Sequence, residues 1–164
     1  MLGCELQGEE LRVVVDAPWH GDTPPMSAPG STNALWEYEV VEFFLLGSHE
    51  HYLEIELGPH GHYLVLELAG RRTPIRTHLP LTYQVEHLGE RWRGTTTVPL
   101  HYLPPELAHA NAYAIHGLGA ERRYLACYPV PGATADFHRL ECFGALERAF
   151  TDELAEARAA RAGR

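Results

Sequence analysis

The chain has 164 residues, of which 45% are hydrophobic and 21% charged, a composition typical of one globular domain. Its 13 basic and 22 acidic side chains give a net charge of −9. This balance argues against nucleic acid or an anionic membrane as the main partner, because phosphate binding needs concentrated positive charge. A neutral or cationic ligand fits the charge, and so does a purely solubilising role.

The sequence contains no recognisable signal for export or membrane insertion. Its apolar runs are too short to span a bilayer, and the opening residues, MLGCELQGEEL, lack the apolar segment of a secretory signal. The three cysteines, Cys4, Cys127 and Cys142, match no zinc-binding spacing. We therefore expect reduced thiols in a cytoplasmic protein, with Cys127 as a small core residue.

The first predicted element is a strand over residues 9–16, EELRVVVD, where apolar and polar side chains alternate. Residues 17–33 then form a proline-rich loop that carries Trp19, His20 and Asp22. Connections of this length are usually functional or mobile.

The central prediction concerns residues 35–68, which read as three consecutive strands over 38–46, 50–57 and 62–68. A four-residue Gly58–Gly61 turn joins the last two strands. If that turn is symmetric, Leu57 lies opposite His62, Ile55 opposite Leu64, and Leu53 opposite Leu66. These residues would form one dry face of the sheet.

The other face is predicted to be acidic and to bear tyrosines. Its members on the hairpin would be Tyr52, Glu54, Glu56, Tyr63, Val65 and Glu67. On the preceding strand, the same alternation separates Val41, Phe43 and Leu45 from Val40, Glu42 and Phe44.

The rest of the chain predicts further short strands near 73–78, 82–88, 91–98, 111–118, 122–128 and 137–143. From about Leu146 the composition favours a helix, with Leu146, Phe150 and Leu154 on one stripe. We therefore predict an all-β fold, an antiparallel β-sandwich over 1–145, followed by a short C-terminal helix over 146–164 that frays at its end.

Several segments resemble known families. LWEYEVVEFFL with YLEIELGPHGHYLVL is similar to the strand-and-hairpin core of DOMON-like β-sandwiches, which are related to carbohydrate-binding module family 9. TVPLHYLPPEL resembles the edge strand and turn of that group, and ADFHRLECFGAL its closing motif. A tighter resemblance, over roughly residues 10–147, is to a small uncharacterised family of cytosolic proteins with LW-YEVVE, YLE-EL-PHG, AIHG and YPVP…DFH…E segments.

The resemblance implies two antiparallel sheets with a ligand site on the concave face or at one rim. Relatives bind sugars, and more distant ones bind haem. Family 9 modules clasp a terminal sugar between tryptophans, for which Trp36 and Trp92 are the strand-associated candidates here. A second stacking ring would have to be a tyrosine such as Tyr124 or Tyr128. For haem, Met26 lies in the long loop and no second axial ligand can be assigned.

The candidate ligand-binding residues are Trp36, Glu42, Glu54, Glu56, Arg71, Tyr128 and His138. Clustered carboxylates beside aromatic rings suit sugar binding, because the carboxylates accept hydroxyl protons while the rings pack on C–H faces. The same glutamates could instead form a solvated acidic face or pair with Arg71, Arg72 or Arg139.

Among the eleven histidines, His49 and His51 share a strand face, as do His60 and His62 if the strand extends back. Metal ligation needs three or four converging donors, and the presumed faces place His62 beside leucines, so structural histidines are favoured and no metal ligand is assigned. The sequence indicates no cofactor and no catalytic motif. Our reading is a non-catalytic domain that binds a small polar ligand resembling a carbohydrate. Two alternatives stay open: a hydrolase or metal-dependent enzyme that uses the Glu/His cluster, and a protein-interaction module. The sequence indicates no oligomeric state.

Overall fold

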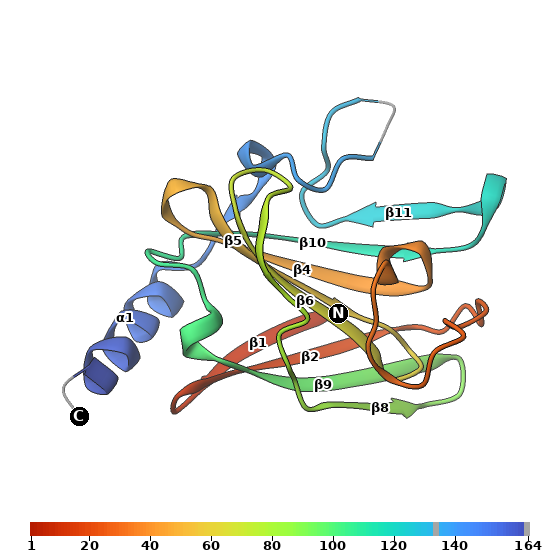
Figure 1. The fold of residues 1–164 in the computed structure, drawn as a ribbon, viewed down its shortest axis with the longest axis horizontal. Helices are drawn as coiled ribbons and strands as arrows, with labels where there is room; N and C mark the ends of the chain where they lie inside the picture. Colours follow the sequence, from red (N-terminus) through yellow and green to blue (C-terminus); the bar gives the residue numbers. More distant parts are fainter. Residues whose placement is uncertain (133–134, 163–164) are drawn as a thin grey trace.

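The computed structural model describes residues 1–132 and 135–162, and it shows two β-sheets packed face to face with a helix at one end (Figure 1). The smaller sheet has four antiparallel strands in the order β1-β2-β9-β8. Their bounds are β1 Leu2–Gln7, β2 Glu10–Pro18, β8 Tyr83–His87 and β9 Arg91–Pro99. The predicted β-sandwich with a C-terminal helix is confirmed, although β1 was not predicted.

The larger sheet follows the order β11-β10-β4-β5-β6-β3, with β7 beside β6 and β12 beside β10. Its pairings are antiparallel except for the short β3–β6 pair, which is parallel. The bounds are β3 Gly30–Ser31, β4 Val40–Leu46, β5 His51–Leu57, β6 His62–Ala69, β7 Pro74–Thr77, β10 His109–His116, β11 Arg123–Ala126 and β12 Gly144–Ala145.

The main core lies between the two sheets and is built from every second residue of the facing strands. Leu11, Val13 and Val15 on β2 face Val41, Phe43 and Leu45 on β4, and all are buried. This period of two places one side of each strand in the core, where each large apolar side chain contributes about 1.5–3 kcal/mol. The predicted division of β4 into two faces is confirmed.

The β5–β6 hairpin differs from the prediction by one residue of register. Leu57 pairs with Tyr63 and Ile55 with Val65, because Gly58 and His62 close the turn through a backbone hydrogen bond of 2.9 Å. The loop therefore has three residues, ending at Gly61, whose φ of 81° suits glycine. The expected pairings of Ile55 with Leu64 and Leu53 with Leu66 are wrong.

This shift reverses the faces of β6, since a one-residue slip turns every side chain over. Val65 is buried in the main core, and Tyr63 packs against that core. Leu64, Leu66 and Leu68 instead share the outer face with Glu54 and Glu56. The outer face is therefore mostly apolar, and its glutamates are the exception.

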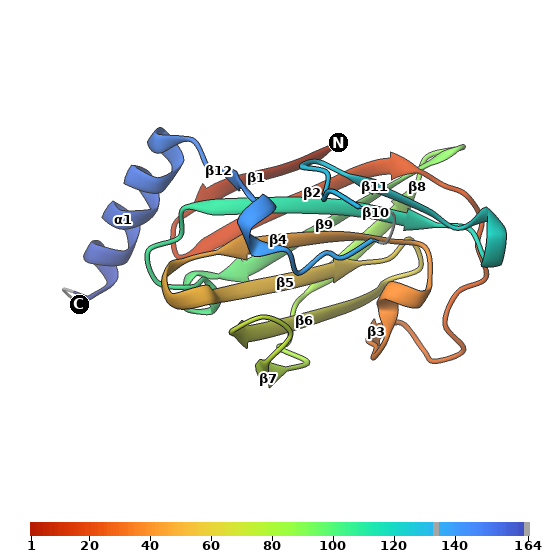
Figure 2. The same ribbon diagram turned by 90° about the horizontal axis from the view of Figure 1, so that it is seen from above.

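Loop segments cover this outer face and enclose two small apolar clusters. One cluster comprises Phe44, Tyr52, Leu68, Tyr113, Leu140 and Phe143, and the other Leu35, Val40, Leu64 and Ile115. Figure 2 shows the segment before β12 lying across β4 and β5. The predicted strand over 137–143 is wrong, because this segment contains a 3-10 turn, η5 Leu140–Cys142, and pairs with no neighbouring strand. A second turn, η1 Leu35–Glu37, precedes β4.

The C-terminal helix, α1 Arg148–Ala162, packs against one end of the sandwich (Figure 1). Leu154 is buried in the main core, with Leu146 and Phe150 against it, as predicted. The Arg158 guanidinium donates hydrogen bonds to the carbonyls of Leu103 and Pro104 at 2.9 and 2.8 Å. Part of the predicted fraying falls on residues 163–164, outside the described residues, and the division at 145/146 stays a prediction.

The structure bears on two smaller expectations, about membrane-spanning segments and about Cys127. Within the described residues, no helix combines the length and apolarity needed to cross a membrane. Cys127, expected in the core, is exposed, because it lies just after the end of β11.

Candidate functional site

Three glutamates meet on the outer face of the larger sheet. Glu42 on β4 lies directly opposite Glu56 on β5, and Glu54 is two residues away on the same face. All three are at least nine-tenths buried, and one carboxylate oxygen from each lies within 4.8 Å of the others. The strand alternation predicted this grouping.

Most oxygens of these carboxyl groups have no hydrogen-bond partner within 3.5 Å among the described residues, although the Trp36 backbone N–H is close enough to lower the pKa of Glu56. Within residues 1–132 and 135–162, both oxygens of Glu42, both of Glu56 and one of Glu54 are buried and unpaired. Burial raises the pKa of Glu54 to about 8 and that of Glu56 to about 10, the latter also because of Glu42 and Glu54. Burial also raises the pKa of Glu42 well above its usual value. Arg122 and Arg72 lower the pKa values of Glu42 and Glu54, but burial outweighs them, so the cluster favours bound protons unless a further cation is present.

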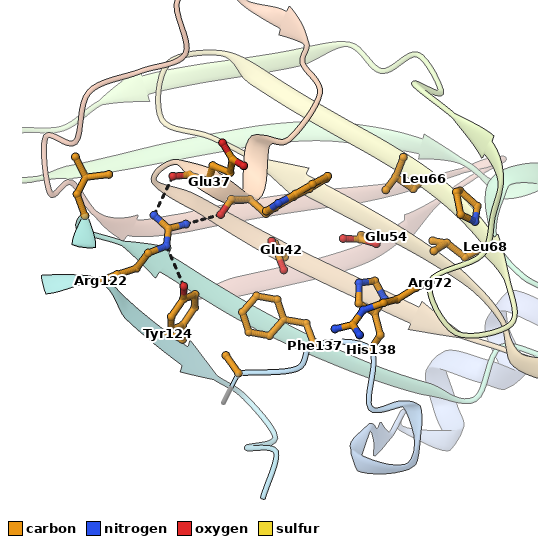
Figure 3. Close-up of a pocket in the computed structure, with 14 residues that line it drawn as sticks. Glu37, Glu42, Glu54, Leu66, Leu68, Arg72, Arg122, Tyr124, Phe137 and His138 are labelled. Atoms are coloured by element: carbon orange, nitrogen blue, oxygen red, sulfur yellow. Dashed lines mark hydrogen bonds between the residues drawn. The ribbon is translucent and has the colours of Figure 1, made fainter. Parts of the chain in front are cut away.

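A cavity of about 790 Å³ opens above Glu42 and Glu54. Figure 3 shows both carboxyl groups between Phe137 and His138 on one side and Leu66 on the other. Trp36, Glu37 and Tyr124 complete its aromatic and polar wall. The volume lies within the range of small-molecule sites.

Arg122 holds the wall of the cavity together. Its guanidinium donates hydrogen bonds to the carbonyl of Glu37 at 2.9 Å and to the carbonyl of Trp36 (Figure 3). It also donates to the carbonyl of Gly117 at 3.0 Å. It also donates to the Tyr124 hydroxyl at 3.1 Å and lies 5.6 Å from that ring's centroid. This one side chain therefore joins η1 to the start of β11.

A second polar group fixes the opposite side of the cavity. The Tyr52 hydroxyl accepts the backbone N–H of Arg72 at 2.9 Å, so its own hydrogen is free to be donated to Nδ1 of His138 at 2.8 Å. Nδ1 is then the acceptor, which leaves the imidazole proton on Nε2. Burial, followed by the charge of Arg72, lowers the pKa of His138 to about 4, so this ring is neutral near pH 7.

Four of the seven sequence-predicted residues line this cavity: Trp36, Glu42, Glu54 and His138. Glu56 is not part of the lining, but its carboxylate oxygen joins the cluster. Arg71 and Tyr128 lie elsewhere. Arg71 forms an ion pair with Glu141 at 2.7 Å, and the Tyr128 ring packs over Gly144 on a different surface.

The other predicted partners of the glutamates and of Trp36 form their ion pairs and packing contacts elsewhere, with the exception of Tyr124. Arg72 pairs with Asp136, and Arg71 and Arg139 both pair with Glu141, so none of the three arginines pairs with the glutamate cluster. Trp92 is 1% exposed in the main core and cannot clasp a ligand with Trp36. Tyr124 is the tyrosine that reaches the cavity.

Sequence reasoning missed Arg72, Arg122 and Phe137 as lining residues. Phe137 had a signal, since it precedes His138 in the DFH segment. Arg122 had no such signal in the sequence, because the residues that it contacts in η1 lie 85 and 86 positions earlier in the chain.

The histidines do not form a metal set. His20 and His116 stack with ring centroids 3.6 Å apart, and Nε2 of His62 bonds to the Ser27 carbonyl at 3.0 Å. Throughout the part of the chain that the structure describes, Glu42, Glu54 and Glu56 form the single group of three or more His, Cys, Asp or Glu residues close enough to share an ion.

Comparison with solved structures supports the fold. A crystal structure from Bacteroides uniformis, named as that of a "putative carbohydrate-binding protein", aligns with a TM-score of 0.68 over 84% of this chain and 72% of that chain. The two sequences are 17% identical, so this likeness concerns the fold alone.

Comparison with curated sequences gives much higher identity, although no protein-family model matches the chain. The UPF0462 protein C4orf33 homolog of Mus musculus is 45% identical over 85% of this chain and 76% of the mouse protein. The human protein is 45% identical over 79% of this chain and 69% of its own length, and the Danio rerio homolog 42% over 83% and 74%. The chain therefore belongs to the UPF0462 family.

Proposed function

We propose that the cavity above Glu42 and Glu54 binds a small, hydroxyl-rich ligand of the carbohydrate class without chemically changing it. One observation supports this most directly: buried, unpaired carboxyl groups lie on the floor of an open cavity of about 790 Å³. A buried polar group without a partner costs about 1–3 kcal/mol, a cost that a bound hydroxyl group would offset.

The cavity offers both kinds of contact that a sugar ring uses. Trp36 and Tyr124 are 42% and 49% exposed, so both rings have apolar surface available to C–H groups. Glu42 and Glu54 supply acceptors for hydroxyl protons, and Nε2 of His138 supplies a donor. A ligand would therefore contact aromatic rings along the wall and polar groups on the floor.

The solved structure from Bacteroides uniformis also supports this proposal, through its fold and its printed name. The names of the UPF0462 relatives describe no ligand, so they neither favour nor oppose a sugar.

The test is calorimetry with mono- and oligosaccharides, chosen from hits on a glycan array. We expect saturable binding by the wild type and about fivefold weaker binding by Trp36→Ala, because stacking on an aromatic ring contributes on the order of 1 kcal/mol. Trp19→Ala is a matched control, since Trp19 is 41% exposed but is absent from the cavity lining. The absence of binding at millimolar sugar, or an equal loss in the control, would contradict the proposal.

A further inference from the structure

We propose that Glu42, Glu54 and Glu56 bind one divalent cation, Ca²⁺ or Mn²⁺, at the floor of the cavity. The ion site depends on these three side chains alone and does not require that the ligand be a sugar. It would explain why three acidic side chains are buried side by side on neighbouring strands.

The first argument is geometric. One oxygen from each carboxyl group lies within 4.8 Å of the other two. Oxygen ligands surround Ca²⁺ at about 2.3–2.6 Å, so two oxygens on opposite sides of one ion are about 4.6–5.2 Å apart. Three oxygens within this distance of one another can therefore share a single ion after small side-chain adjustments.

The second argument is the lack of any other partner. Acidic residues often cluster without binding an ion, but such clusters are solvated or paired with arginines. Here Glu42 and Glu54 are 1% and 4% exposed, have unpaired oxygens and line the cavity. Like charges placed directly opposite each other, as in Glu42 and Glu56, destabilise a sheet unless bound protons or a cation neutralise them.

The nearby guanidinium groups are already occupied. Arg122 donates to the carbonyls of Trp36, Glu37 and Gly117. Arg72 donates to Asp136 at 2.8 Å. Across the described ranges, no salt bridge joins either arginine to the three glutamates. Both arginines remain close enough to lower the carboxyl pKa values, but they do not satisfy the oxygens.

The donor atoms indicate the class of ion. The cluster contains carboxylate oxygens and no histidine or cysteine, a set that hard cations prefer over zinc or copper. Mg²⁺ needs oxygens at about 2.0–2.1 Å, which limits opposite ligands to about 4.2 Å. Ca²⁺ accepts longer and more variable distances than Mg²⁺ and gives up its water more readily, so Ca²⁺ or Mn²⁺ fits carboxylates held on two strands better.

The ion would also connect the cluster to the ligand. Ca²⁺ takes about six to eight oxygen ligands, and three carboxyl groups leave positions unfilled. Since the cavity opens over Glu42 and Glu54, water or two hydroxyl groups of a bound sugar would occupy those positions. This last step rests on the proposed function, whereas the ion site does not.

The experiment is a titration of the chelator-treated 164-residue chain with CaCl₂ or MnCl₂ alone, followed by calorimetry and, for Mn²⁺, by electron paramagnetic resonance. We expect one ion per chain and a higher melting temperature in its presence. Glu42→Gln, Glu54→Gln and Glu56→Gln should each weaken binding by at least about tenfold, since even outer-shell changes around metals cost 10–100-fold. Glu86→Gln, an exposed glutamate on β8, is the control.

Saturable wild-type binding that is lost in the three cluster variants and kept in Glu86→Gln supports the site. No saturable binding by the wild type at millimolar ion overturns it, a result that does not depend on whether any variant folds. Unchanged affinity in all three cluster variants also overturns it. Repeating the sugar titration with chelator or with ion separates the two proposals, because either ligand can bind when the other does not.

Discussion

The Tyr52 hydroxyl lies 2.8 Å from Nδ1 of His138 while it accepts the backbone N–H of Arg72 at 2.9 Å. Tyr52 belongs to β5, whereas its two partners belong to segments that cover the outer face of the sheet. One buried hydroxyl therefore connects the sheet to two sides of the cavity.

Removing this hydroxyl should destabilise the two sides of the cavity that Arg72 and His138 form. Tyr52→Phe leaves Nδ1 of His138 and the Arg72 N–H without their partner, so we expect the free energy of unfolding to fall by about 1–3 kcal/mol. Urea denaturation measures this change. Tyr38→Phe is the control, because no hydrogen bond of the Tyr38 hydroxyl occurs within the described residues. Equal stability of the two variants would contradict the expected role.

The pH dependence of the free energy of unfolding should show that His138 stays neutral in the folded protein. Its pKa is lowered from 6.5 to about 4, chiefly by burial and by Arg72, with Arg71 adding to the effect and Asp136 opposing it. Below pH 6.5 the unfolded chain binds a proton at this position that the folded chain does not. This residue therefore costs the folded state stability as the pH falls toward 4.

The comparison that isolates this effect is wild type against His138→Gln, which cannot titrate. At pH 7.5 we expect the wild type to be more stable, because the Tyr52 hydrogen bond is intact. The difference should shrink or reverse when denaturation is repeated at pH 6 and pH 5. Parallel stability curves across this range would rule out the assigned protonation state.

Arg122 should be irreplaceable by lysine. Its planar guanidinium spans three backbone carbonyls, which the single ammonium of lysine cannot match. We expect Arg122→Lys to lose about 1–3 kcal/mol of stability and to weaken binding of any ligand in the cavity. The neighbouring Arg123→Lys is the control, since Arg123 bonds only within its own segment among the described residues. Thermal unfolding and calorimetry of both variants give the comparison.

Glu56 should lower the free energy of unfolding when no ion is bound, although the proposed ion site needs it. Glu56→Leu removes a buried carboxyl group without a partner and places an apolar side chain opposite Leu64. In chelator, we expect the free energy of unfolding to rise by about 1–3 kcal/mol. Stabilisation by Ca²⁺ or Mn²⁺ should disappear in the same variant.

Glu67→Leu is the companion variant for this measurement. Glu67 also lies on the larger sheet, but its carboxylate pairs with Arg76. Its replacement should give no gain in chelator and should leave any ion-induced stabilisation intact. A gain as large as that of Glu56→Leu would mean that general hydrophobicity, and not the unpaired carboxyl group, explains the effect.

The sequence predicted local features that follow from alternation. The two faces of β4 and the shared face of Glu42, Glu54 and Glu56 could be read directly, because side chains alternate strictly along a strand. The register of β6 could not be read from the sequence. Gly58, Pro59, His60 and Gly61 are compatible with a four-residue or a three-residue loop, and the difference is decided by one backbone bond between Gly58 and His62.

The walls of the cavity were beyond sequence reasoning for a different reason. Arg122 and Phe137 are placed by contacts with distant segments, and neither lies in an element with a recognisable period. Arg71 and Arg72 adjoin each other in a tight turn, where one residue points to Glu141 and the next to Asp136. No pattern in the sequence distinguishes these two directions.

The cavity is enclosed by four stretches of chain, around Trp36, Arg72, Tyr124 and His138, which come from different parts of the sequence. Arg122 joins the first stretch to the third and the Arg72–Asp136 ion pair joins the second to the fourth, so each pair can open locally while the sandwich stays folded. An occupant that touches all four would couple their opening into a single event. Protease cleavage at these surface segments should therefore slow together when the cavity is filled, while cutting elsewhere on the molecule proceeds at its usual rate.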